Sequence, residues 1–158
     1  MRAQTVLLLL LVAITTGYAQ KDSGNAQNKP AANPYISGMY SFLEEGEFVQ
    51  ITVEEQNKIT GFISRYGDSS SDKGAFLDQF IKKGNLAGNS LTFTTELLHG
   101  VGYEFKGTVM RGSGKVPGDE SYYVLKGTLT QTTTDGQQHT STRTREVEFK
   151  SFPQDALP

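Results

Sequence analysis

The chain has 158 residues, a formal net charge of −2, and neither cysteine nor tryptophan. A nearly balanced charge without a basic stripe argues against nucleic acid as a partner. The absence of cysteine excludes disulfides, metal–thiolate sites, thiol nucleophiles and an acylated lipoprotein N-terminus, so a buried core must hold the fold together.

The first segment has the pattern of an export signal. Arg2 supplies a positive charge, residues 6–14 are an unbroken apolar run, and Gly17-Tyr18-Ala19 has the small-x-small pattern of a cleavage site. The run is shorter than the roughly 20 residues that span a bilayer, which favours a cleaved signal peptide over an anchor. We therefore expect residues 1–19 to be removed and the mature protein to be secreted or periplasmic, with no membrane-spanning segment.

The mature chain is predicted to have three parts. Residues 20–34 contain no large apolar side chain, so burial cannot offset the entropy of ordering them, and we expect a flexible leader. Residues 35–152 carry regular apolar patterns and are predicted to form one domain. A short tail over residues 153–158 follows.

Alternation of apolar and polar residues predicts about eight β-strands in this domain. The predicted strands cover residues 37–43, 47–55, 59–66, 80–87, 90–98, 101–111, 121–132 and 139–152. Gly88-Asn89 and Asp135-Gly136 are two-residue hairpin signals between consecutive strands. Residues 75–82 are ambiguous, because their apolar side chains cluster at helical spacing, and they predict one short helix that passes into a strand from about Phe80.

One block of sequence occurs twice, twenty positions apart: residues 103–109 return as residues 123–129. The shared Lys-Gly-Thr places Gly107 and Gly127 on the apolar face, where a strand bends or a neighbouring backbone comes close. Short adjacent strands with such glycines predict an all-β fold, a small antiparallel up-and-down barrel, with an open two-sheet sandwich as the alternative. The interior of such a barrel is filled by side chains or holds one small ligand.

Three segments resemble the layout of the calycins, the lipocalin, avidin and fatty-acid-binding barrels. They are Gly38-Met39-Tyr40, Ile59-Thr60-Gly61-Phe62 and the two Lys-Gly-Thr strands. The resemblance covers most of residues 37–150 and implies a barrel that binds a small molecule. Those families usually carry a tryptophan after the first-strand glycine or in the pocket, and this chain has none. No binding residue is therefore transferred from them, and biotin binding of the avidin kind is not expected.

Candidate binding residues are aromatic or charged side chains in the strands. Tyrosine suits a ligand pocket because it joins an apolar ring to a polar tip, although the same residue can simply pack the core. Arg65 is in phase with Ile59 and Ile63, so it is predicted to point inward and to meet an acidic partner or an anionic ligand; a solvent-exposed rim position is the alternative. The candidate ligand-binding set is Tyr40, Arg65, Tyr103, Phe105 and Tyr123. The predicted interior lining is Val49, Ile51, Ile63, Phe93, Tyr103, Phe105 and Tyr123.

The sequence predicts no catalytic residue, no metal site and no cofactor. His99 and His139 each favour a surface position over a general base or metal ligand, because neither has a partner at ligand spacing. Residues 68–72 hold two aspartates and three serines, but they lack the distal glutamate of a calcium loop and favour a solvated loop.

Three functions remain open at this point. The favoured one is an exported barrel that binds a small, largely apolar ligand. The second is an envelope interaction or structural module with a filled barrel, whose contact surface would be the threonine-rich stretch Thr128–Thr144. An enzyme of unknown type is the third, and no catalytic set marks it. Nothing in the pattern selects an oligomeric state.

Overall fold

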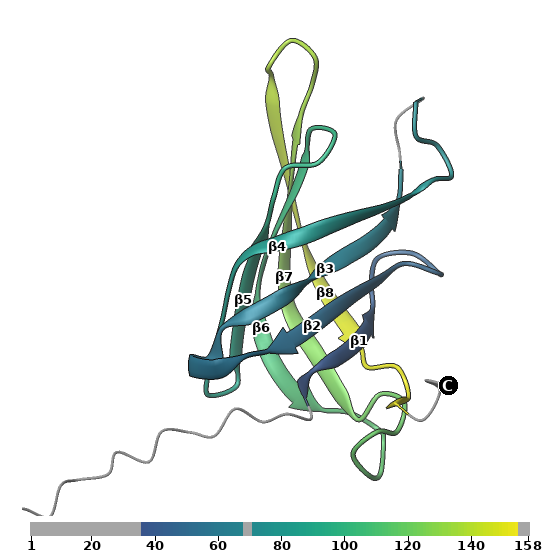
Figure 1. Cartoon of the computed structure of the whole chain (residues 1–158), viewed down its shortest axis with the longest axis vertical. Helices are drawn as coiled ribbons and strands as arrows, with labels where there is room; N and C mark the ends of the chain where they lie inside the picture. Colours follow the sequence, from purple (N-terminus) through teal and green to yellow (C-terminus); the bar gives the residue numbers. More distant parts are fainter. Residues whose placement is uncertain (1–35, 68–70, 155–158) are drawn as a thin grey trace, which may run out of the picture.

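The computed structural model describes residues 36–67 and 71–154. Eight antiparallel strands in sequence order form one sheet that curls into a barrel (Figure 1), which confirms the predicted all-β up-and-down fold. The strands are β1 (Gly38–Ser41), β2 (Phe48–Val53), β3 (Ile59–Tyr66), β4 (Phe76–Ala87), β5 (Ser90–Thr95), β6 (Val101–Arg111), β7 (Tyr123–Thr134) and β8 (Thr140–Lys150). A short 3₁₀ turn, η2 (Glu55–Asn57), joins β2 to β3.

The predicted signal peptide and leader lie outside the described residues, as does most of the predicted tail. Within the described part of the chain, no helix is long and apolar enough to span a membrane.

The short helix expected near residues 75–82 is wrong, because this segment is the first half of β4. β4 pairs first with β3 and then with β5, and its register shifts between Ile81 and Lys83. Such a bulge interrupts period-two alternation, which is why the pattern looked helical. The aromatic side chains that suggested a helical face, Phe76 and Phe80, are instead 52% and 57% exposed on the strand.

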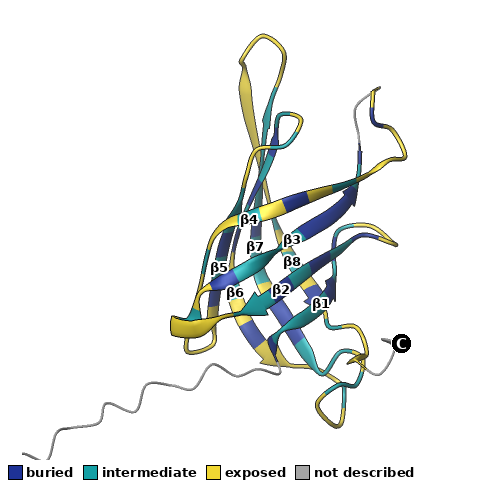
Figure 2. Cartoon of the chain, in the orientation of Figure 1, coloured by how far each residue is buried: buried dark blue, intermediate teal, exposed yellow. Residues whose placement is uncertain are grey.

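The core lies on the inner face of the sheet, in the part of the barrel coloured as buried in Figure 2. The Phe93 and Phe105 rings stack with centroids 5.3 Å apart, and the Phe149 ring lies 5.8 Å from that of Phe105. Six of the seven predicted interior residues are buried: Val49, Ile51, Ile63, Phe93, Tyr103 and Phe105. Tyr123, the seventh, is only half-buried. Side chains therefore fill this part of the barrel.

The two glycines of the repeat lie directly opposite each other, at the centre of the β6–β7 ladder. A Cβ atom on Gly107 would lie 2.5 Å from both the Phe105 ring and the Lys126 carbonyl oxygen. One on Gly127 would lie 2.3 Å from the Lys106 carbonyl oxygen and 2.4 Å from the Gly107 Cα. The close backbone approach predicted from the repeat is therefore present, and Phe105 occupies the space that it leaves.

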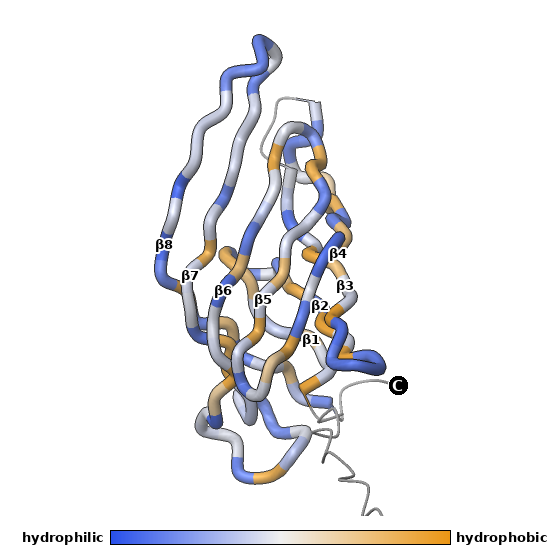
Figure 3. Tube along the Cα trace, turned by 90° about the vertical axis from the view of Figure 1, so that its left-hand side faces the viewer, coloured by the Kyte–Doolittle hydropathy of each residue, from blue (hydrophilic) through white to orange (hydrophobic). Residues whose placement is uncertain are grey.

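The barrel closes at one end only. β1 has four residues and β8 has eleven, and among the described residues they meet through the Tyr40–Ser151 bridge and its surroundings. There the Phe152 N–H donates to the Met39 carbonyl at 2.8 Å, and the Lys150 N–H donates to Ser41 Oγ at 3.0 Å. The turn end of the β7–β8 hairpin projects beyond the barrel (Figure 1) and is largely hydrophilic (Figure 3). In this region, residues of β8 and of the β1–β2 loop line one cavity.

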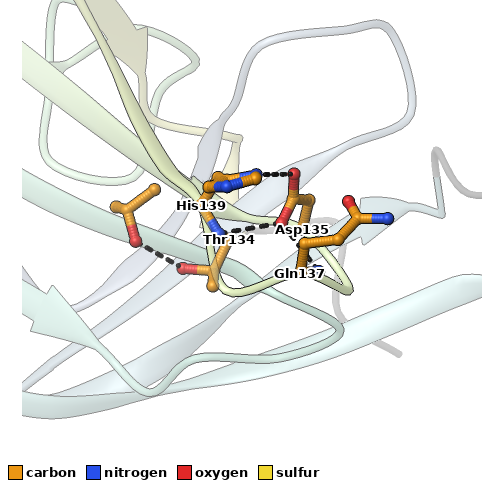
Figure 4. Close-up of polar contacts among 5 residues, drawn as sticks. Thr134, Asp135, Gln137 and His139 are labelled. Atoms are coloured by element: carbon orange, nitrogen blue, oxygen red, sulfur yellow. Dashed lines mark hydrogen bonds and ion pairs between the residues drawn. The ribbon is translucent and has the colours of Figure 1, made fainter.

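The tip of this hairpin is a turn organised by Asp135 (Figure 4). Its carboxylate accepts hydrogen bonds from the backbone N–H groups of Gln137 at 2.9 Å and His139 at 2.8 Å, and Oδ2 lies 3.1 Å from His139 Nδ1. The Asp135-Gly136 signal marked the right connection, but the turn covers residues 135–139, with its left-handed residue at Gln138. His139 is exposed and pairs with Asp135 within the turn.

Candidate ligand-binding site

A cavity of about 350 Å³ lies at the open end of the barrel, within the size range of small-molecule sites. Its walls come from the β1–β2 loop, the end of β3, the start of β6 and the inner face of β7 and β8. The lining residues are Leu43, Glu44, Glu47, Arg65, Tyr66, Gly67, Tyr103, Gln131, Arg143 and Arg145. Because most of these side chains are polar and several are charged, the cavity differs in character from the apolar core.

Arg65 lies in the wall of this cavity and is only 2% exposed, so the inward position predicted from alternation is confirmed over the solvent-exposed rim. Its Nη1 donates to the Tyr66 carbonyl at 3.0 Å, and its Nε donates to Gln79 Oε1 at 3.4 Å. The guanidinium carbon lies 5.9 Å from the centre of the Tyr103 ring, within the range of a cation–π contact. The position of Arg65 is thus set by contacts with β3, β4 and β6.

Gln79 of β4 is the buried residue that supports Arg65. Its side-chain amide nitrogen lies 2.8 Å from Thr95 Oγ1, 2.6 Å from the Glu96 carbonyl and 2.7 Å from the Val101 carbonyl. The amide oxygen accepts from Arg65. The Gln79 amide is fully buried, and both its nitrogen and its oxygen have hydrogen-bond partners. Its own polar atoms and the carbonyl groups that it contacts are therefore satisfied, although they are buried. It also joins β4 to the start of β6 beneath the cavity.

Glu47 is a buried carboxylate that joins the β1–β2 loop to β3. Oε1 accepts from the Tyr66 backbone N–H at 2.9 Å, and Oε2 accepts from the Glu44 N–H at 3.2 Å. Burial raises the pKa of Glu47 above its ordinary value, while the backbone hydrogen bonds and the positive charge of Arg65 partly oppose this effect. The carboxylate therefore has its oxygens committed to backbone donors.

The raised pKa of Glu47 predicts a pH dependence of stability. The folded state holds this proton more firmly than the unfolded state, so the stabilising contribution is complete below about pH 4.5 and is lost as the pH rises through the folded pKa. Glu47→Gln cannot titrate. The unfolding free energy of the native chain should therefore fall relative to that of Glu47→Gln as the pH rises above that value.

Urea denaturation across this pH range measures the difference between the two proteins. Glu45→Gln, which removes an exposed carboxylate from the same loop, supplies the control. A constant difference between the native chain and Glu47→Gln at every pH would contradict the assignment.

Arg143 and Arg145 are the cavity residues that the sequence reasoning missed. Arg145 Nη2 donates to Gln131 Oε1 at 2.9 Å, whereas its buried Nε has no hydrogen-bond partner among the described residues. Arg143 lies in the threonine-rich stretch Thr128–Thr144 that suggested a contact surface, and Arg145 directly follows it. Counting back in steps of two from the buried Phe149 would have placed both on the inner face.

The five candidate binding residues do not form one site. Arg65 and Tyr103 line the cavity, whereas Phe105 is fully buried in the core below it. Tyr40 is also buried, its hydroxyl donates to the Ile36 carbonyl at 2.6 Å, and burial raises its pKa. Tyr123 lies at the opposite end of the barrel, where it and Tyr40 line a cleft of only about 10 Å³.

The second histidine also has a structural contact. His99 Nδ1 lies 2.5 Å from Asp72 Oδ2, which connects the β5–β6 loop to the β3–β4 loop. In the described ranges, no group of three histidine or acidic side chains could hold a metal ion. Part of the aspartate- and serine-rich loop, residues 68–70, lies outside those ranges.

Comparison with known proteins relates this barrel to solved structures only. No protein-family model matches the chain, and no curated protein matches it. A crystal structure of the rhizavidin–biotin complex matches with a TM-score of 0.52 and 11% identity, over 74% of this chain and 92% of that one. Apo short afifavidin matches with a TM-score of 0.52 and 12% identity, over 77% and 96%. The protein therefore has the fold of avidin-type barrels, as the calycin resemblance implied.

Proposed function

We propose that the protein is an exported barrel that binds a small molecule in the cavity at its open end. The observation that carries this proposal is the cavity of about 350 Å³ above a core that side chains already fill. A second support is the rhizavidin structure, since a barrel of this fold occurs there in complex with biotin. The apolar run and cleavage pattern of residues 1–19 support export.

The lining refines the expectation of a largely apolar ligand. Leu43 and the rings of Tyr66 and Tyr103 offer apolar contacts, and aromatic rings supply much of the contact energy in small-molecule sites. The remaining walls are polar and would orient the ligand. We therefore propose an amphipathic ligand whose apolar part packs against these three side chains.

The first experiment is native mass spectrometry of the protein purified from the exported fraction of its host. We expect a chain that begins at Gln20 and a bound small molecule. Recovery of the exported protein with residues 1–19 retained would reject the processing step.

A binding assay tests the cavity itself. The neutral fluorescent probe N-phenyl-1-naphthylamine should bind the native protein, and Leu43→Trp should weaken binding by placing a larger ring in the cavity wall. Met110→Trp makes a comparable change at an exposed position outside the cavity and should leave binding unchanged. If both variants bind the probe as the native protein does, the cavity is not the site.

A filled interaction module is the second candidate function. It is supported by the exposed aromatic side chains of β4, Phe76 and Phe80, and by paired threonines across β7 and β8. This function requires a protein partner from the envelope and no small molecule. Recovery of such a partner together with an empty cavity would favour it over ligand binding.

A further inference from the structure

We infer that the cavity is built to seat an anionic group of its ligand, a carboxylate, phosphate or sulfonate, between Arg65, Arg143 and Arg145. This inference rests on the proposed function, because it names the chemistry of the ligand for the same cavity. The three arginines come from two strands, β3 and β8, that lie far apart in the sequence, and all three line the same cavity.

Arg145 provides the most specific evidence. Gln131 holds one end of its guanidinium group, and the buried Nε has no acceptor among the described residues. A buried donor without an acceptor is costly, and an oxygen atom of a bound ligand would remove that cost. Because the guanidinium fork matches the oxygen pairs of carboxylates and phosphates, an anion is the natural acceptor.

The charge balance of the cavity points the same way. The two charged residues that β8 contributes to the cavity, Arg143 and Arg145, are both cationic. Glu47 already accepts two backbone hydrogen bonds. Within the part of the chain that the structure describes, neither Arg143 nor Arg145 forms an ion pair with an acidic side chain.

Two lysines on the neighbouring strands β6 and β7 differ from these arginines. Lys106 Nζ lies 2.6 Å from Glu104 Oε1, and Lys126 Nζ lies 3.9 Å from Glu148 Oε2, so these cations have partners within the protein. The cavity arginines of β8 lack such partners. Grouped positive charges repel one another, and a bound anion would relieve that repulsion. The missing negative charge is thus supplied most simply by the ligand.

Two fluorescent probes that differ by one sulfonate test this inference. 1-Anilinonaphthalene-8-sulfonate carries the anion, and N-phenyl-1-naphthylamine has the same ring system without it. We expect the native protein to bind the sulfonate probe more tightly. Arg145→Met should weaken that probe by roughly 10- to 100-fold, the usual range for a hydrogen bond to a charged group, and should change binding of the neutral probe little.

Further variants separate the seat from general charge effects. Arg143→Met should also weaken the sulfonate probe, and since Arg143 is exposed its loss should not prevent folding. Arg145→Lys keeps the charge without the planar fork and should fall between the native protein and Arg145→Met. Arg111→Met is the matched control, because Arg111 stacks on Tyr122 and lies outside the cavity.

The outcomes distinguish the two proposals. In two cases the anion seat is wrong and the ligand-binding function stands. In the first, the neutral probe binds as tightly as the sulfonate probe. In the second, the sulfonate probe binds more tightly, but it does so equally in Arg143→Met and Arg145→Met. An equal loss in Arg111→Met would also overturn the seat, since it would reflect surface charge alone. If neither probe binds, both proposals fall.

Discussion

Gly127→Val is expected to lower the free energy of unfolding by about 3 kcal/mol, a large share of the stability of a small domain. The reason is geometric, because a Cβ atom at this position would lie 2.3 Å from a carbonyl oxygen of the neighbouring strand. Backbone atoms in a paired ladder cannot move aside as a flexible side chain can. Gly107→Val should have a comparable effect, since its Cβ would meet both the Phe105 ring and the backbone of β7.

Thermal or urea denaturation measures this effect against Thr108→Val. Thr108 is the exposed neighbour of Gly107 on β6, and valine fits a strand well, so this control should retain nearly native stability. Equal melting temperatures for the three variants would show that the two strands do not approach each other as closely as the structure has them.

Gln79→Leu is the second substitution with a large expected effect, a loss of about 3 kcal/mol. Leucine has a similar size but removes an amide whose nitrogen lies within hydrogen-bond distance of Thr95, Glu96 and Val101. Burying polar groups without partners costs about 1–3 kcal/mol for each group left unsatisfied. Arg65 also loses the acceptor of its Nε, so the wall of the cavity should change as well.

The distinguishing result is a combined loss of stability and of probe binding. Urea denaturation gives the first, and titration with 1-anilinonaphthalene-8-sulfonate at a temperature where the variant is folded gives the second. Gln50→Leu is the control. It makes the same chemical change at a half-buried position of β2, on the face opposite the buried Val49 and Ile51, and should change neither stability nor probe binding. Native stability of Gln79→Leu would show that its polar contacts contribute little.

Strand alternation predicted much of the fold because each strand has one face in the core and one toward solvent. This asymmetry is clear in β2 and β6, where buried residues alternate with more exposed ones apart from Gly107, and those strands were located within a few residues. The prediction from alternation fails in β4. There the bulge shifts the register midway along the strand, and the exposed Phe76 and Phe80 place apolar residues on the solvent face.

The candidate site was harder to predict because alternation assigns a face but no depth. Phe105 and Tyr103 share the inner face of β6, yet one lies in the filled core and the other at the cavity. Depth depends on the stagger between strands, which sequence periodicity does not report. Arg143 and Arg145 were missed because the start of β8 is polar on both faces, so that their phase has to be carried back from Phe149 at the other end of the strand.

The shortness of β1 has a consequence for how the molecule behaves beside its own copies. Among the described residues, β1 covers the outer edge of β8 only near its last residues, and an uncovered strand edge is a template for pairing with another chain. The residues along that edge are dominated by alternating charges, with Arg143 and Arg145 on one face and Glu146 and Glu148 on the other. A second β8 added there would have to lose water from these groups, so the same side chains oppose fibre-like assembly.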